Sequence, residues 1–406
     1  MKKIEGGVTA AKGFQAASAA AGIKYQGRSD MALVYTSSPA VCAGTFTTNI
    51  VKAEPVLRDQ EIVAGKMPVH AVVLNSGIAN ACTGEEGRSI NQYMASVMAE
   101  KLNVEPEQVL TASTGVIGVQ IARKPLARGA VLLKEALAGT KEAGRRAAEA
   151  IMTTDTVPKE SAVSFEVDGK TVTIGGMSKG SGMIHPNMAT MLSVTTTDAI
   201  ISQDILQEIV SAVVDDTFNM ISVDRDTSTN DTYLVLANGE ADADIKKGTK
   251  AYEDFKMALY SVATDLAKQM AADGEGCTRL FEVQVQHCRS KEAAKKLSKS
   301  VISSNLVKTM VYGKDANVGR ILCALGYAGV DFDPERVDLT LEAGNEEIVL
   351  VKNGMPIGYS EEKATELLGS DVVTVHCDMN EGDASATAWG CDLTYDYIKI
   401  NGDYRS

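Results

Sequence analysis

A β-hairpin signal near the middle of the chain is the feature that most constrains its fold. The segment "AVSFEVDGKTVTIGG", residues 162–176, holds two runs of alternating apolar and polar side chains around Asp168-Gly169. Alternation with a period of two indicates strands, and an Asp-Gly pair readily supplies the two positive φ angles of a type I′ turn. The segment therefore predicts two antiparallel strands and a sheet to which they belong.

Helical and strand patterns are mixed on both sides of this hairpin. Apolar runs separated by turn residues predict several short strands within 31–75. Alternation returns later in "VDLTLEA", "EEIVLV", "VVTVHCDM" and "CDLTYDYIKI". Helices are expected from near Gly87 and over about 124–152, 203–216, 252–272 and 291–304. Gly274 is expected in a left-handed position after the helix at 252–272. We predict a large α/β (α+β) protein with more than one sheet.

Composition excludes several classes of function. The net charge is −13, and Lys and Arg form no long block, which argues against a nucleic-acid partner. The seven cysteines are scattered, with no CxxC pair and only four His, so we expect no metal site and free thiols in a reducing, cytoplasmic location. The N-terminal segment lacks the continuous apolar stretch of a signal peptide, and no run approaches the roughly 18 residues of a membrane span.

The segment "SKGSGMIHPNMATMLSVTTTDA", residues 178–199, joins a Gly/Ser loop directly to a strand-like run that begins at Thr190. If the peptide bond between Ala189 and Thr190 were cut, the new α-amino group, with an ordinary pKa of about 8, could deprotonate the hydroxyl of its own residue. The cut could come from the same hydroxyl attacking the Ala189 carbonyl. The alternative is a glycine loop that enters an ordinary β-strand.

An acylated nucleophile also needs donors for the developing oxyanion. The segment "TASTGVIG", residues 111–118, places Ser113, Thr114 and Gly115 in one turn, where a hydroxyl and a backbone N–H could converge. The alternative is a simple Ser/Thr turn.

Several segments of the chain, in order, resemble those of one family. The segment "KGSGMIHPNMATML" resembles the cleavage segment of the ornithine acetyltransferases, also called glutamate N-acetyltransferases, of the cyclic arginine pathway. Further resemblances are "FTTN", "NSGIANACTG", "STGVIG", "AIMTTDT", "DTSTNDT", "ADGEG", "ATAWGCDLT" and "IKINGDYRS". They extend over almost the whole chain.

The resemblance implies a role for individual residues. Thr190 would be the nucleophile and Ala189 the last residue before the cut, which divides the precursor into chains 1–189 and 190–406. Thr114 and Gly115 would form the oxyanion hole. The substrate contacts would be Thr153, Lys179, Thr190, Glu275, Asn401 and Ser406. The match does not decide between Thr153 and Thr154.

The chemistry of these residues suits an acylated amino acid. Lys179 could hold a carboxylate, and Glu275 an ammonium or amine proton. Taken without the resemblance, they are a solvated loop lysine and a glutamate beyond a helix end. Two positions depart from the family: Arg225 stands where Gly is usual, and Val318 where Trp is common.

The resemblance implies a self-cleaving enzyme that moves acetyl from N-acetylornithine to glutamate through an acetyl-Thr190 ester. It needs no cofactor, and some members also accept acetyl from acetyl-CoA. A layered α/β fold around β-sheets and an α2β2 assembly are implied as well. Two alternatives stay open: an N-terminal-nucleophile amidohydrolase or aminopeptidase on the same scaffold, and a protein that binds acylated amino acids without turnover.

Overall fold

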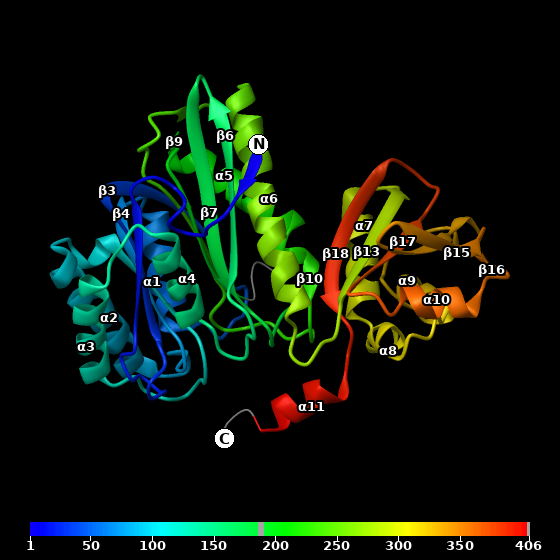
Figure 1. Ribbon diagram of the computed structural model, residues 1–406, viewed down its shortest axis with the longest axis horizontal. Coiled ribbons are helices and arrows are strands. Elements are labelled where there is room, and N and C mark those ends of the chain that lie inside the picture. The colour runs from blue at the N-terminus through cyan, green and yellow to red at the C-terminus, as the bar shows by residue number, and fades with distance from the viewer. Residues whose placement is uncertain (186–190, 404–406) are drawn as a thin grey trace. The chain divides into compact units, whose positions relative to one another are not determined.

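The computed structural model describes residues 1–185 and 191–403 and divides the chain into two compact units. The first unit comprises Met1–Gly180, Asn187–Phe218 and Thr227–Leu266. The second comprises Ser181–Pro186, Asn219–Asp226 and Ala267–Ser406. Each unit is built around its own large sheet (Figure 1). The expectation of a mixed α/β protein with more than one sheet is therefore confirmed.

The sheet of the first unit has nine strands in the order β1-β6-β7-β8-β11-β3-β4-β5, with β2 paired to β3. These strands are β1 Lys2–Ile4, β2 Phe14–Ala19, β3 Met31–Phe46, β4 Val69–Asn75, β5 Val109–Ser113, β6 Lys159–Val167, β7 Lys170–Lys179, β8 Leu192–Thr197 and β11 Thr232–Ala237. Strand β8 runs antiparallel to β7 and parallel to β11, so the sheet is mixed. A small parallel pair is formed by β9 Ile200–Ile201 and β12 Asp244–Ile245.

Helices cover this sheet because each presents an apolar stripe to it. They are α1 Glu54–Ala64, α2 Gly84–Leu102, α3 Arg123–Glu135, α4 Lys141–Ala150 and α5 Gln203–Asp216. Helix α4 packs on β2 and β3, α5 packs on β3, and α2 lies beside α3 (Figure 1). Ala147 and Ile151 join Val72, Leu192 and Leu234 in a core cluster that buries β8 and β11. The strand that follows residue 190 is thus anchored in the protein interior.

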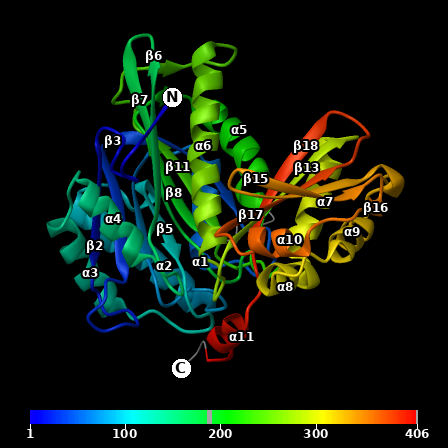
Figure 2. The same cartoon turned by 45° about the vertical axis from the view of Figure 1, so that its right-hand side comes forward.

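The second unit has a seven-stranded sheet in the order β10-β18-β13-β17-β14-β15-β16. These strands are β10 Ile221–Ser222, β13 Leu280–Cys288, β14 Asp338–Ala343, β15 Glu346–Lys352, β16 Met355–Pro356, β17 Val372–Asp378 and β18 Ala384–Cys391. The helices are α7 Lys291–Ser303, α8 Asn305–Gly313, α9 Val318–Gly326, α10 Glu361–Leu367 and α11 Tyr395–Gly402. Helix α7 lies against β13 and β18 (Figure 2). Helix α6, Lys250–Ala272, runs from the first unit into the second.

Several local predictions are confirmed. Asp168 and Gly169 have φ angles of 49° and 77° in the turn between β6 and β7, as a type I′ hairpin requires. The predicted helix at 203–216 is α5, and those at 252–272 and 291–304 differ from α6 and α7 by no more than two residues at an end. All seven cysteines are free. No helix in the described part of the chain is long and apolar enough to span a bilayer.

Two predictions about the first unit are wrong. Residues 31–75 do not form several short strands: β3 alone extends over 16 residues with a register shift against β4, and α1 follows it with a proline in its first turn. The predicted helix over 124–152 is two helices, α3 and α4. The break occurs because Ala138 pairs with Ala16 of β2, and Thr140 then caps α4 by accepting from the Ala143 N–H.

Two predictions about the second unit are also wrong. The alternating run "CDLTYDYIKI" ends in helix α11, which Thr394 caps, because the neighbouring β18 already pairs with β13 and β10. Gly274 does not take a left-handed φ; Gly276 does, at 67°. Gly274 instead avoids a side chain, because a Cβ there would lie 2.6 Å from Cys391 Sγ.

Candidate functional site

Two of the family-like segments, 75–84 and 113–118, interlock at the end of β5. Ser113 Oγ donates to Asn75 Oδ1 at 2.6 Å, and the Thr114 N–H donates to the Asn75 carbonyl at 3.0 Å. The Val116 N–H donates to the Gly77 carbonyl at 3.2 Å. Because the Thr114 N–H is already bonded, the donor that this residue can offer a substrate is its hydroxyl. The turn is therefore a fixed platform rather than a loose Ser/Thr turn.

Gly115 is required by this close packing. Its φ is 130°, which L side chains rarely adopt, and a Cβ would lie 2.2 Å from the Gly77 carbonyl carbon. Backbone cannot yield to such a contact as a flexible side chain could. Only glycine fits between the two segments, as expected where a backbone N–H must come close to a ligand.

Lys179 lies beside the same turn. It is the last residue of β7, its side chain is buried, and its Nζ donates to Thr114 Oγ1 at 3.5 Å. Its partner across the sheet is Leu192, two residues after Thr190 in the sequence. The structure thus brings together three predicted residues, Thr114, Gly115 and Lys179, and links them to the strand that the nucleophile would precede.

Asp155 organises this region and was not singled out from the sequence. Its carboxylate accepts from the Thr153 N–H at 3.0 Å, the Gly180 N–H at 2.7 Å and Lys159 Nζ at 2.7 Å. The Asp155 and Lys159 side chains are fully buried. Its place in "AIMTTDT", one of the family-like segments, was the signal that could have found it.

The pKa of Asp155 follows from its burial and from these neighbouring groups. Burial alone would raise its pKa, but the ammonium groups of Lys179 and Lys159 and the hydrogen bonds that the carboxylate accepts lower the pKa to about 2. Asp155 is therefore a permanent anion that compensates two buried cations. It also holds the backbone of Thr153, the predicted substrate contact; Thr153 and Thr154 are both half-buried.

The predicted cleavage site, Ala189 and Thr190, lies outside the described residues, and so does Ser406. The described chain resumes at Met191, and β8 begins at Leu192. The Met191 carbonyl accepts from the Thr232 N–H at 2.8 Å, which ties the start of β8 to β11. The assignment of Thr190 as nucleophile stays a prediction.

Glu275 and Asn401, the two predicted contacts in the second unit, bind each other. Asn401 Nδ2 donates to Glu275 Oε2 at 2.7 Å. The Glu275 N–H donates to the Ser181 carbonyl at 3.2 Å, and a Cβ on Gly182 would lie 2.2 Å from the carboxylate carbon. The glycine in "GSG" therefore leaves room for the glutamate. The pair is brought together by the fold although 126 residues separate its members in sequence.

The two departures from the family pattern have different structural settings. Arg225 has a φ of 73°, the left-handed region that favours glycine. This explains why Gly suits that position and predicts some strain for Arg. Val318 is the first residue of α9 and is buried.

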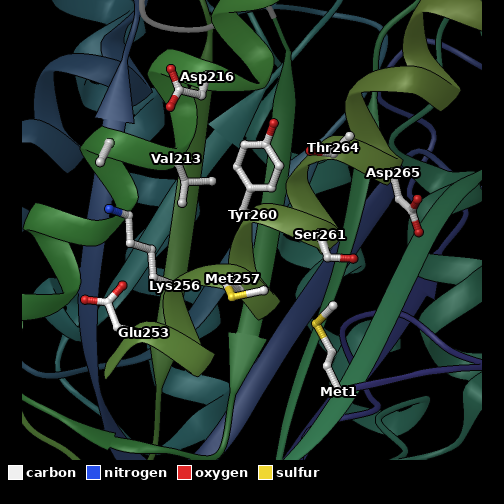
Figure 3. Close-up of a pocket in the computed structure, with 11 residues that line it drawn as sticks. Met1, Val213, Asp216, Glu253, Lys256, Met257, Tyr260, Ser261, Thr264 and Asp265 are labelled. Atoms are coloured by element: carbon white, nitrogen blue, oxygen red, sulfur yellow. The ribbon is translucent and has the colours of Figure 1, made fainter. Parts of the chain in front are cut away.

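A cavity of about 420 Å³ lies between α5 and α6 in the first unit (Figure 3). Val213, Met257 and Tyr260 line it from the two helices, and Met1 closes one side. None of the predicted site residues lines this cavity. Among the residues described, no group of three or more His, Cys, Asp or Glu side chains is placed to hold a metal ion.

Comparison with known proteins extends over nearly the whole chain. A family model described as "ArgJ family" matches residues 15–406. The arginine biosynthesis bifunctional protein ArgJ of Symbiobacterium thermophilum is 49% identical over 410 residues, covering 100% of both chains. Arginine biosynthesis bifunctional protein ArgJ 1 of Clostridium acetobutylicum is 48% identical over 395 residues, 97% of this chain and 96% of that protein. The solved ornithine acetyltransferase complexed with ornithine from Mycobacterium tuberculosis is 41% identical, with a TM-score of 0.43, over 46% of this chain and 96% of that one.

Proposed function

We propose, from the premise that the chain belongs to the ArgJ family, that Thr190 is the nucleophile with which it transfers acetyl from N-acetylornithine to glutamate. As a member of that family the chain is an acyltransferase of arginine biosynthesis. The observation that carries the site assignment is the buried contact between Lys179 and Thr114, beside the turn that only Gly115 can form.

The reaction begins with self-cleavage. Thr190 Oγ attacks the Ala189 carbonyl carbon, the acyl group moves from nitrogen to oxygen, and water hydrolyses the ester. This frees the α-amino group of Thr190, which then serves as the general base of its own hydroxyl. The predicted chains 1–189 and 190–406 both contribute to the nine-stranded sheet, since β7 precedes the cut and β8 follows it. Backbone hydrogen bonds between β7 and β8 would therefore keep the two chains associated.

The transfer then takes two steps. Thr190 Oγ bonds to the acetyl carbon of N-acetylornithine, the amide C–N bond breaks, and ornithine leaves with the proton that the Thr190 amine has taken up. The amine of glutamate then attacks the ester carbonyl carbon, the C–Oγ bond breaks and N-acetylglutamate leaves. The proton lost by the attacking amine returns to Thr190 Oγ through the Thr190 amine. The Thr114 hydroxyl and the Gly115 N–H stabilise the negative oxygen in both steps. We assign Lys179 and Thr153 to the substrate on the first unit, and Glu275, Asn401 and Ser406 on the second.

Intact mass before and after a brief exposure to N-acetylornithine tests this proposal. We expect two chains, 1–189 and 190–406, with one acetyl group added to the second. Thr190→Ala should remain one uncut, unacetylated chain, and Thr190→Ser, which keeps a hydroxyl, should retain measurable cleavage. If Thr190→Ala kept full transferase activity, the nucleophile assignment would be wrong.

The acceptor is tested by the products. Incubation with N-acetylornithine and glutamate should yield N-acetylglutamate in amounts equal to the ornithine released. Free acetate in its place would assign the chain to the hydrolases, because water would then resolve the ester. Unchanged N-acetylornithine together with binding measured by calorimetry would indicate a protein that binds without turnover.

The relatives named bifunctional favour a second acetyl donor. We propose that acetyl-CoA also acylates Thr190, since the same nucleophile and oxyanion donors serve a thioester. Free CoA thiol released in step with N-acetylglutamate would support this, and no thiol release above that of Thr190→Ala would contradict it.

We also propose that the two chains assemble as α2β2, which a native mass of twice the cleaved pair would support.

A further inference from the structure

Residues 227–231, a short segment before β11, contact two parts of the site. One is the turn that carries Thr114 and Gly115, and the other is the start of β8, the strand that follows Thr190. The FTTN segment, residues 46–49, holds residues 227–231 by hydrogen bonds. Thr47 Oγ1 donates to the Ser228 carbonyl at 2.8 Å, and the Thr47 N–H donates to the Asp231 carbonyl at 3.0 Å. Asn49 Nδ2 donates to the Thr227 carbonyl at 3.0 Å. The backbone of the segment is thereby fixed, so its last two side chains can act as rigid connectors.

Asn230 reaches the oxyanion side. Its side-chain amide is buried and donates both protons, to the Ser113 carbonyl at 2.7 Å and to the Ala79 carbonyl at 2.5 Å. Ser113 directly precedes Thr114, and Ala79 belongs to the segment that packs against Gly115. One side chain therefore joins the two interlocked segments of the oxyanion turn.

Asp231 reaches the nucleophile side. Its side chain is buried, and the Met191 N–H donates to its carboxyl group. The next residue, Thr232, donates its N–H to the Met191 carbonyl at 2.8 Å. Asp231 and Thr232 together hold both backbone polar groups of the residue that follows Thr190. Asp231 Oδ2 has no hydrogen-bond partner within the part of the chain that the structure describes.

We propose that Asn230 and Asp231 are positioning residues that set the distance between the oxyanion donors and the nucleophile. Asn230 fixes the turn that carries Thr114 and Gly115, while Asp231 fixes the backbone next to Thr190. Because the two are adjacent on one rigid segment, neither half of the site can shift without straining the other. This inference rests on the proposed role of Thr190 and names the groups that hold it.

Whether Asp231 must be able to ionise distinguishes a positioning role from a role in proton transfer. Burial raises its pKa well above the ordinary value, although Ser228, Lys179 and Thr47 favour the charged form. A carboxamide has nearly the shape of a carboxyl group and keeps the acceptor oxygen that the Met191 N–H needs. Asparagine should therefore replace Asp231 if it positions the backbone, but not if it exchanges a proton with the reaction.

Four variants test the proposal, with the rate of self-cleavage and the single-turnover rate of acetylation as the measured quantities. Asp231→Ala and Asn230→Ala should each lower both rates about 100-fold, with the KM for N-acetylornithine within about 2-fold of the original. Asp231→Asn should stay within about 5-fold of the original rates. Asn230→Asp, which keeps the shape but lacks the two donors, should be as slow as Asn230→Ala.

Asp198 provides the matched control. It is also buried, accepts backbone N–H groups from Lys12 and Thr173, and follows the opposite end of β8. Asp198→Ala should lose stability without losing rate, as judged on the folded fraction by circular dichroism. The proposal is overturned if Asp198→Ala and Asp231→Ala slow the reaction equally, if Asp231→Asn is as slow as Asp231→Ala, or if Asp231→Ala is as fast as the original.

The original chain is measured first. If it is neither cut before Thr190 nor acetylated on residues 190–406, the proposed function itself fails, whatever the variants do. If it is cut and acetylated but the variants are unaffected, only the positioning role fails.

Discussion

The predicted site residues of the two units are held in opposite ways. In the first unit Thr114, Gly115 and Lys179 lie at strand ends, with a buried carboxylate compensating the lysine. In the second unit Asn401 lies on α11, a helix with no buried residues, and Glu275 follows α6 in a loop. The difference indicates that the proposed oxyanion donors, Thr114 and Gly115, have the rigid support that stabilising a transition state needs. The predicted substrate contacts do not all share it, because Lys179 is buried beside that turn whereas Asn401 stands on an exposed helix.

The largest expected effect comes from removing Asp155. Asp155→Ala removes the buried carboxylate that pairs with the ammonium of Lys159, and we expect the free energy of unfolding to fall by about 3–5 kcal/mol. Denaturant unfolding measures this. The matched control is Asp396→Ala, which breaks the exposed pair with Lys399 and should cost far less stability, because water screens that pair. Equal losses of unfolding free energy in the two variants would contradict the difference in rigidity between the site residues of the two units.

The next effect compares two glycines of the same segment, of which only Gly115 is closely packed. Gly115→Ala places a Cβ against the Gly77 backbone, so we expect the rate of acetyl transfer to fall about 100-fold or more. A Cβ in Gly118→Ala would meet nothing within 4 Å, and the φ of 75° there lies in the left-handed region, so this variant should cost only about 1–2 kcal/mol of stability. Steady-state kinetics of the two variants measures the rate of acetyl transfer in each. A normal rate for Gly115→Ala would remove that residue from the oxyanion hole.

Acid should loosen the second unit before the first. Burial lowers the pKa of His185 to about 4, below its ordinary value of 6.5, so its contribution to stability is complete above pH 6.5 and is lost as the pH falls towards 4. Despite burial, Lys179 and Lys159 lower the Asp155 pKa from 3.8 to about 2, so its contribution, about 2 kcal/mol, is lost only between pH 4 and pH 2.

Two probes follow the two transitions. Trp389, the one tryptophan of the chain, lies on β18 and reports on the second unit by fluorescence. Hydrogen exchange of β7 and β8 reports on the first. His185→Gln should abolish the fluorescence change between pH 6.5 and 4. Simultaneous loss of both signals would mean that the units do not differ in acid stability.

A smaller effect is expected at the contact between Asn401 and Glu275. Asn401→Ala removes one hydrogen bond to Glu275, and we expect the KM for N-acetylornithine to rise about 10-fold with little change in kcat. Steady-state kinetics on Asn401→Ala and Glu275→Gln, alone and together, gives the coupling between them. A fall in kcat at unchanged KM would place Asn401 among the groups that act on the transition state.

The smallest effect concerns Arg225. Arg225→Gly relieves a left-handed backbone angle of 73° and should raise the free energy of unfolding by about 1 kcal/mol, reduced by the greater freedom of glycine in the unfolded chain. Thermal unfolding measures the gain. The matched change Arg289→Gly, at an arginine whose φ is not positive, should give no gain. A loss of stability in Arg225→Gly would show that the arginine side chain makes a contribution larger than its backbone strain.

Local chemistry made part of this protein predictable. The Asp168-Gly169 hairpin and helix α5 follow from neighbouring residues alone, because a turn needs positive φ angles and a helix needs one apolar stripe. The Thr114-Gly115 turn was found because motif and chemistry coincide within a few residues. By contrast, "YDYIKI" alternates like a strand but is helical, because no sheet edge was left for it beside β18.

The sequence by itself determined the mixed α/β class, the turn at Thr114-Gly115, and the family to which the chain belongs, since these depend on residues close together or on their order. Only the tertiary structure decided that Asp155 compensates Lys159 and Lys179, that Asn401 binds Glu275, and that Asn230 and Asp231 join the two sides of the site. Those contacts link residues from separate elements, and burial gives them their strength, because a charge or donor removed from water must find its partner within the fold.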